Sequence, residues 1–224
     1  MARVKVIADI SGNHGGSLDK AIALIKAAAE SGCDYAKFQY YEPTKMPDYA
    51  ENAKIYHELQ VWPNWIDSLF GIAAEAKIPL FASVFDIAGA RHIQQYNPPF
   101  VKIASPESTR LANYPELVGE VKRGVRIIFS SGWEDYELIT SLMGSDDVLL
   151  FCPPGHPAST NAWVPMEFDG LSDHCADLTN AARAIAQGFE WIERHIKLDE
   201  NCIDAAFSSN PREMTELCKL AKAY

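Results

Sequence analysis

The chain has 224 residues, of which 48% are hydrophobic and 22% are charged, as in an ordinary soluble globular protein. Its formal net charge of −10 at pH 7 argues against nucleic-acid or anionic-membrane partners, because attraction to phosphate needs a basic surface. Five scattered cysteines and an N-terminal apolar run too short for a signal peptide or transmembrane helix predict a cytoplasmic protein with reduced thiols.

Short β-branched runs alternate with amphipathic helical stretches along the chain. Strands are predicted over residues 4–10, 33–39, 78–83, 100–105, 125–131, 148–152, 169–174 and 190–196. Helices are predicted over 18–31, 62–76, 87–95, 115–122, 135–143 and 178–187. A last helix is expected to begin with Asn210 as N-cap, Pro211 at the first helical position and Glu213 as capping-box partner. The Pro-rich stretch P-P-G-H-P-A-S-T-N-A-W-V-P takes the place of a helix after the sixth strand.

This alternation predicts an α/β fold with a parallel sheet and right-handed crossovers. Eight strand–helix units favour a closed (β/α)8 TIM barrel at the compact end of that fold's size range. The competing open doubly wound sheet usually has about five or six strands, and its G-x-G-x-x-G signature is absent after the first strand. With no linker or shift in composition, residues 1–224 are expected to form a single compact domain.

Polar residues gather at the predicted carboxyl ends of the strands, where a TIM barrel forms its site. The first strand ends at Asp9 and runs into S-G-N-H-G-G. The others contribute, in chain order, Lys37 and Gln39, Ser83, Lys102, Ser105 and Glu107, Ser130, Ser172 and His174, and finally Glu193 and His195. One polar strand end would mean little, but seven that converge are difficult to explain as core packing.

The last strand, W-I-E-R-H-I-K-L-D, carries charges within an apolar run. Such charges are costly to bury unless they are paired or bind a metal. Period-two alternation places Glu193 and His195 on the face toward the barrel mouth, and we expect Arg194 and Lys197 at outward or end positions.

The histidines of the seventh and eighth strands form a candidate metal pair. Neutral imidazoles such as His174 and His195 suit Mn²⁺, Zn²⁺ or Fe²⁺, and Asp9, Glu193 or Asp204 can complete or support the ligand shell. Lys37 and Lys102, which singly could be snorkelling strand-end lysines, together with the strand-end serines offer what a phosphate or carboxylate requires.

Several of these segments resemble, in order, the sialic acid synthase (N-acetylneuraminate synthase) family. They are I-A-D-I-S-G-N-H-G-G, A-K-F-Q, F-A-S-V-F-D, V-K-I-A-S-P-E, I-F-S-S-G, G-L-S-D-H, I-E-R-H-I and the D-x-x-x-S that begins at Asp204. The resemblance runs from about residue 5 to residue 217. It implies a (β/α)8 barrel that condenses phosphoenolpyruvate with a sugar aldehyde, usually an N-acetylated hexosamine, to give a 2-keto-3-deoxy sugar acid and phosphate.

The resemblance also implies roles for individual residues. Phosphoenolpyruvate would be held by Lys37, Ser83, Lys102, Ser105, Ser130 and Ser172, with Gln39 beside them. His174 and His195 would bind the divalent cofactor, for which Mn²⁺ is expected. The catalytic carboxylates around the aldehyde and the metal would be Asp9, Glu107, Glu193 and Asp204.

The sequence departs from the family pattern mainly in its sugar-binding half. Asp9 replaces the usual glutamate, Pro154 and His156 stand where an asparagine and an aromatic residue are typical, and residues 40–61 differ from the usual sugar-binding loop. Because the sequence ends at Tyr224, only the barrel is expected, without the family's small C-terminal antifreeze-like domain. A homodimer or a separate protein would then supply the remaining sugar contacts.

Two other functions remain open at this point. One is a metal-dependent lyase or aldolase that uses the same histidine pair on another keto acid or phosphorylated substrate. The other is a non-catalytic barrel that binds a ligand or a partner chain.

Overall fold

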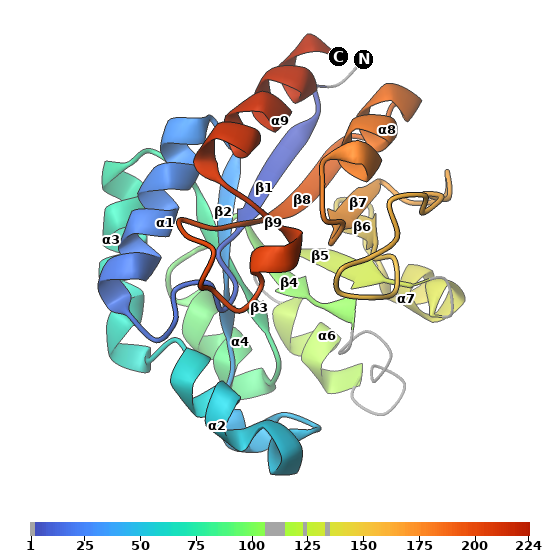
Figure 1. The fold of residues 1–224 in the computed structure, drawn as a ribbon. Helices are drawn as coiled ribbons and strands as arrows, with labels where there is room; N and C mark the ends of the chain where they lie inside the picture. The colour runs from blue at the N-terminus through green and yellow to red at the C-terminus, as the bar shows by residue number, and fades with distance from the viewer. Residues whose placement is uncertain (1–2, 106–114, 123–124, 133–134) are drawn as a thin grey trace.

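The parallel sheet closes on itself, because strand β1 pairs with both β2 and β8. The structure is a computed structural model that describes residues 3–105, 115–122, 125–132 and 135–224 (Figure 1). Its strands are β1 (Lys5–Asp9), β2 (Tyr35–Tyr40), β3 (Leu80–Val84), β4 (Phe100–Ile103), β5 (Arg126–Ser131), β6 (Val148–Phe151), β7 (Gly170–Asp173), β8 (Trp191–Ile196) and β9 (Ser208–Ser209). The predicted (β/α)8 barrel is therefore confirmed.

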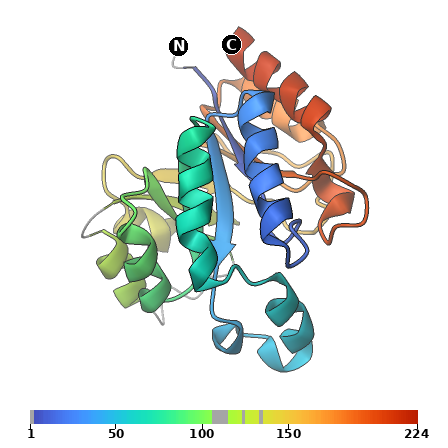
Figure 2. The same ribbon diagram turned by 90° about the vertical axis from the view of Figure 1, so that its left-hand side faces the viewer.

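Helices surround the barrel on the outside (Figures 1 and 2). The α-helices are α1 (Leu18–Ser31), α2 (Tyr49–Leu59), α3 (Ile66–Glu75), α4 (Ile87–Gln94), α6 (Pro115–Val121), α7 (Tyr136–Leu142), α8 (Thr179–Gln187) and α9 (Pro211–Ala223). Short 3-10 turns are η1 (Pro43–Lys45), η2 (Pro63–Trp65) and η4 (Ala205–Phe207). None of the helices in the described ranges is long and apolar enough to cross a membrane.

Most predicted elements are confirmed, with shifts of one or two residues at their ends. The segment between β6 and β7, which the structure describes throughout, contains no helix, as its prolines predict. Asn210 caps α9 in a complete capping box with Glu213. The helix predicted over 62–76 instead begins as η2 and continues as α3. Neither α2 nor the two-residue strand β9, which pairs with β8, is among the sequence predictions.

The first helix illustrates why these sequences form these elements. Ser17 caps it by accepting a hydrogen bond from the Lys20 amide, and Gly32 ends it in the left-handed conformation at φ 84°. Its buried side chains recur every three or four residues and pack against the strands: Ala21, Leu24, Ile25 and Ala28.

Apart from the apolar side chains between the helices and the strands, a separate apolar cluster fills the inside of the barrel. Its members are Ile7, Phe81, Phe100, Ile128, Val148 and Leu150. Tyr35 and Trp191, the first residues of β2 and β8, stack at 5.8 Å and cover the amino-terminal end. Side chains therefore fill this end of the barrel, and a cavity opens toward the carboxyl ends of the strands.

Candidate active site

A cavity of about 680 Å³ opens at the carboxyl ends of the strands, where the sequence predicts the site. Eleven of the predicted site residues line it: Asp9, Lys37, Gln39, Lys102, Ser105, Ser130, Ser172, His174, Glu193, His195 and Asp204. Ser83 does not line the cavity, but its hydroxyl accepts a hydrogen bond from Lys37 at 3.1 Å. Glu107 lies outside the described residues.

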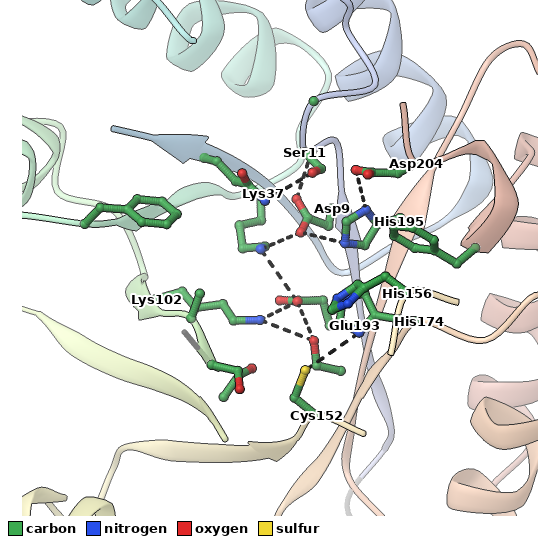
Figure 3. Close-up of a pocket in the computed structure, with 18 of the residues that line it drawn as sticks. Asp9, Ser11, Lys37, Lys102, Cys152, His156, His174, Glu193, His195 and Asp204 are labelled. Carbon is green, nitrogen blue, oxygen red and sulfur yellow. Dashed lines mark hydrogen bonds and ion pairs between the residues drawn. The ribbon is translucent and has the colours of Figure 1, made fainter. Parts of the chain in front are cut away.

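Two lysines and two carboxylates form a buried charge cluster on the floor of this cavity (Figure 3). Lys37 Nζ lies 2.6 Å from Asp9 Oδ2 and 3.6 Å from Glu193 Oε1. Lys102 pairs with the same Glu193 oxygen, which also accepts a hydrogen bond from the Ser172 hydroxyl at 2.9 Å. All four charged side chains are nearly inaccessible to solvent. The strands therefore hold two fixed cations at the point where phosphate binding is predicted.

The protonation of this cluster follows from burial and pairing. Burial by itself would raise the pKa of Glu193, but the ammonium groups of Lys102 and Lys37 outweigh it, so the pKa is lowered. For Lys37, burial opposes the charge, yet Asp9 and Glu193 raise its pKa. Burial lowers the pKa of Lys102, and Glu193 offsets only part of that effect. Lys102 is thus the more readily deprotonated lysine of the two.

Two imidazoles stand beside the charged floor. The ring centroids of His174 and His195 are 5.0 Å apart, and both rings make edge contacts with Phe207. Burial, followed by the neighbouring charge of His195, lowers the pKa of His174 well below its ordinary value. Burial also lowers the pKa of His156, whose ring centroid lies 4.4 Å from that of His174. His174 is therefore neutral near pH 7, which is the form that binds metals.

These donors fit a borderline divalent ion such as Mn²⁺. Within the described ranges, no three His, Cys, Asp or Glu side chains are already arranged as a ligand set. The carboxylate oxygen Oε2 of Glu193 is buried without a hydrogen-bond partner in the described part of the chain. An unpaired buried carboxylate oxygen in a cavity that also holds two imidazoles indicates that a ligand or a cation completes the site.

The asparagine of S-G-N-H-G-G fixes the segment that carries Asp204, a role that the sequence analysis missed. Asn13 donates hydrogen bonds to the Ile196 carbonyl and to the Ser208 hydroxyl, each at 2.9 Å, and it accepts one from the Asp204 amide at 3.0 Å. Ser208 in turn donates to the Asp204 carbonyl at 2.7 Å. A polar residue within a glycine-rich stretch, directly after a site strand, is the sequence signal that could have identified it.

Arg194 has the predicted outward position and is nevertheless buried. Its guanidinium pairs with Asp173 at 3.1 Å and donates to the Cys175 carbonyl and to the Ser209 hydroxyl. Lys197, at the strand end as predicted, donates to the Ala205 carbonyl at 2.9 Å. Both charges therefore hold the loops after β7 and β8 and do not face the cavity.

The positions that depart from the family pattern also line the cavity. His156 and Pro154 come from the irregular segment after β6. The stretch after β2, with α2, adds a set of apolar side chains: Tyr41, Met46, Ile55, Tyr56 and Leu59. Phe85 and Ile203 lie among the lining residues as well. One part of the cavity is thus ionic, and another is apolar.

The closed barrel and its polar mouth define a TIM-barrel protein with its site at the carboxyl ends of the strands. The chain belongs to the NeuB family, whose sequence model matches residues 24–224.

Comparisons with three known proteins show what the chain is similar to. The spore coat polysaccharide biosynthesis protein SpsE of Bacillus subtilis is 29% identical over 251 residues, covering 96% of this chain and 66% of that protein. The human N-acetylneuraminate-9-phosphate synthase is 29% identical over 248 residues, covering 96% of this chain and 68% of that protein. In structure, an N-acetylneuraminic acid synthetase from Leptospira borgpetersenii, crystallised with citrate, superposes with a TM-score of 0.85 at 24% identity, covering 99% of this chain and 83% of that one. The chain thus spans about two thirds of the length of the curated relatives it matches.

Proposed function

We propose that this chain is the barrel of a metal-dependent enzyme that condenses phosphoenolpyruvate with an N-acetylated sugar aldehyde. The products would be a 2-keto-3-deoxy sugar acid and phosphate. The observation that carries the proposal is one cavity that holds a buried lysine pair beside two imidazoles. Membership of the NeuB family and the synthase names of several relatives support it.

The lysines and serines account for binding of the anionic substrate. Lys37 and Lys102 would face the phosphate and carboxylate groups, and hydroxyls from Ser105, Ser130 and Ser172 would donate hydrogen bonds to the same oxygens. Ser83, predicted to bind the same anion, would act by holding Lys37. Because these groups come from several strands of one rigid barrel, they hold phosphoenolpyruvate in one orientation. That orientation turns a bimolecular reaction into a positioned one.

His174 and His195 would hold the divalent ion, which supplies a Lewis acid for a carbonyl oxygen. In the proposed reaction, C3 of phosphoenolpyruvate forms a bond to the aldehyde carbon, water adds at C2, and phosphate leaves by cleavage of its bond to C2. The water loses both of its protons: one ends on the former aldehyde oxygen, and the other leaves with the phosphate as the C2 hydroxyl becomes the keto group. Asp9, Glu193 and Asp204, which line the cavity, would move these protons, and Glu107 stays a predicted fourth carboxylate.

We also propose that residues 1–224 act as one barrel domain in the cytoplasm, with a second copy or a separate protein completing the sugar contacts. The first experiment is the same whether or not a second copy or another protein is needed. Phosphate release from phosphoenolpyruvate should be measured with Mn²⁺ and a panel of N-acetylated aldoses. His195→Ala is compared with His92→Gln, a histidine on α4 that does not line the cavity.

Aldose-dependent release that His195→Ala abolishes and His92→Gln retains is the expected result. Phosphoenolpyruvate should also bind in calorimetry and lose its affinity when the lysine pair is altered. A folded wild-type protein that does not bind phosphoenolpyruvate would overturn the proposal. Cleavage of a keto acid without phosphate release would instead favour the lyase or aldolase alternative.

A further inference from the structure

Helix α2 and the η1 turn before it form one side of the cavity, and α2 contributes no residue to the hydrophobic core. Figure 2 shows η1 and α2 beyond the carboxyl end of β2, apart from the helices that pack along the barrel. None of the α2 residues is buried. Its apolar side chains Ile55 and Leu59 instead line the cavity. A helix that turns its apolar residues toward a cavity leaves carbon surface for a ligand to cover.

We define the apolar wall as Tyr41, Met46, Ile55, Tyr56, Leu59, Phe85 and Ile203, all of which line the cavity. Two wall residues that are distant in sequence, Leu59 and Ile203, both lie next to Gly12. A Cβ placed on Gly12 would lie 3.0 Å from Leu59 Cδ1 and 3.0 Å from Ile203 Cγ2. At the rim, Ile55 is 41% exposed and Ile203 is 51% exposed. These two large side chains are among the most exposed hydrophobic residues described in the chain, although both lie at a cavity.

The hydroxyl groups of the wall are already engaged. Tyr41 donates to the Tyr56 carbonyl at 3.3 Å, and the Tyr56 hydroxyl donates to Asp48. The rings of Tyr41 and Phe85 pack edge to face at 5.6 Å. A ligand that reaches this wall therefore meets aromatic and aliphatic carbon. A sugar hydroxyl buried there would lose its water without gaining a partner.

The charges around the cavity do not suit a second phosphate. Among the described residues that line it, the cations are Lys37 and Lys102, and no arginine is present. Both lysines lie on the floor, and four carboxylates share the cavity with them: Asp9, Asp135, Glu193 and Asp204. Lys45, at the base of the α2 segment, is engaged by Glu42 at 2.6 Å and by Asp86 at 3.0 Å. From these described side chains, a phosphate on the second substrate would meet more negative than positive charge.

We infer that the acceptor aldehyde is an N-acetylated deoxy sugar whose end remote from the aldehyde carries methyl groups and no phosphate. This inference rests on the proposed function, since phosphoenolpyruvate occupies the lysine floor. The aldehyde then faces the histidines, and the terminal methyl and acetamido methyl groups pack against the apolar wall. The site would then prefer a methyl-ended acceptor to a hydroxymethyl- or phosphate-ended one. Methyl groups gain contact with the wall, whereas a hydroxymethyl or phosphate group loses hydration there without gaining a partner.

The test is acceptor selectivity with phosphoenolpyruvate and Mn²⁺. Three N-acetylated aldehydes that differ at the terminal carbon are compared: one ending in methyl, one in hydroxymethyl and one in a phosphate ester. We expect kcat/KM for the methyl compound to exceed that for the hydroxymethyl compound by about tenfold or more, with the phosphate ester lowest.

Ile55→Lys places a cation on the exposed rim of the wall. It should raise the ratio of phosphate-ester to methyl-compound activity by about tenfold or more. Glu51→Gln changes the net charge of α2 by the same amount, at an exposed residue that does not line the cavity. This matched control should leave the ratio unchanged.

The outcomes separate the inference from the proposed function. Phosphate release with the phosphate ester preferred would overturn the inference and leave the function standing. If no acceptor supports release, saturation-transfer NMR with bound phosphoenolpyruvate tests the wall directly. If the acceptor methyl groups are saturated in the wild-type protein and not in Ile55→Lys, the inference is supported. Equal saturation in the wild-type protein and the variant, or none in either, would overturn it.

Discussion

His195 and Asp204 form a carboxylate–imidazole pair, with Nδ1 of the ring 3.1 Å from Oδ2 of the carboxylate. Nε2, the other nitrogen of the ring, lies 3.4 Å from Asp9 Oδ2. When the Nδ1–H group donates a hydrogen bond to Asp204, the lone pair of Nε2 faces a second carboxylate, that of Asp9. That carboxylate oxygen is also paired with the Lys37 ammonium group, at 2.6 Å. The carboxylate behind Nδ1 fixes the tautomer that leaves Nε2 available to a metal.

The first prediction concerns this pair. Asp204→Asn should weaken Mn²⁺ binding by about 10- to 100-fold, because a neutral amide orients the imidazole less firmly and makes it less basic. The free ion is measured by electron paramagnetic resonance in a titration. Asp199→Asn is the matched control, since Asp199 lies on the same loop and pairs with Lys20 at the surface. Equal Mn²⁺ affinity in both variants would remove Asp204 from the metal site.

The second prediction concerns Asn13, which joins the loop after β1 to the loop after β8. Asn13→Ala leaves the Ile196 carbonyl, the Ser208 hydroxyl and the Asp204 amide without this partner. We expect the free energy of unfolding to fall by about 1–3 kcal/mol in urea titrations. Asn64→Ala, at an exposed residue of η2, should change it by less than about 0.5 kcal/mol. If Asn13→Ala matches Asn64→Ala, these hydrogen bonds do not hold the two loops together.

The barrel and its charged floor were predictable because they follow from local patterns. Alternation of strand and helix signals indicates the parallel sheet, and the carboxyl ends of parallel strands meet at one end of a barrel. Lys37, Lys102 and Glu193 therefore had to come together, although only the structure shows that one Glu193 oxygen serves both lysines. Which oxygen bonds to which ammonium group depends on strand stagger, and no sequence spacing specifies it.

The apolar wall and the Arg194 pair were not predictable for a different reason. Periodicity assigns apolar residues to a core, but Ile55 and Leu59 face a cavity, so α2 carried no recognisable core pattern. Arg194 is neutralised by Asp173 on the neighbouring strand, a contact between residues that are distant in sequence. Both features arise from tertiary contacts that single-segment patterns do not contain.

The third prediction separates folding from ligand binding on the cavity floor. Lys102→Met leaves Glu193 buried with one cation fewer, so it should lower the free energy of unfolding by about 3–5 kcal/mol. The double variant Lys102→Met/Glu193→Gln removes both charges and should recover most of that stability. Neither variant should bind phosphoenolpyruvate with measurable affinity in calorimetry. Lys219→Met, at an exposed residue of α9, is the control for both measurements.

Binding by the stable double variant would show that Lys102 does not hold phosphoenolpyruvate. The opposite result, in which the double variant is as unstable as Lys102→Met, would mean that packing around the lysine stem stabilises the fold more than the ion pair does.

The fourth prediction concerns the acid sensitivity that His14 gives to the fold. His14 is fully buried, and Nδ1 accepts a hydrogen bond from the Gly16 amide at 3.1 Å. Burial lowers the pKa of His14 from 6.5 to about 4. Between these values the unfolded chain binds the proton and the folded chain does not, so stability is present above pH 6.5 and is lost as the pH falls toward 4.

This difference amounts to a loss of about 2 kcal/mol between pH 7 and pH 5 from His14 alone. His14→Gln keeps an acceptor for the Gly16 amide and does not titrate. Urea unfolding at both pH values should therefore show a loss smaller by about 2 kcal/mol in the variant than in the wild-type protein. Between pH 8 and pH 7, where His14 is mostly neutral in both states, the two proteins should change nearly in parallel. An equal loss between pH 7 and pH 5 in both proteins would mean that His14 accepts its proton without opening the loop after β1.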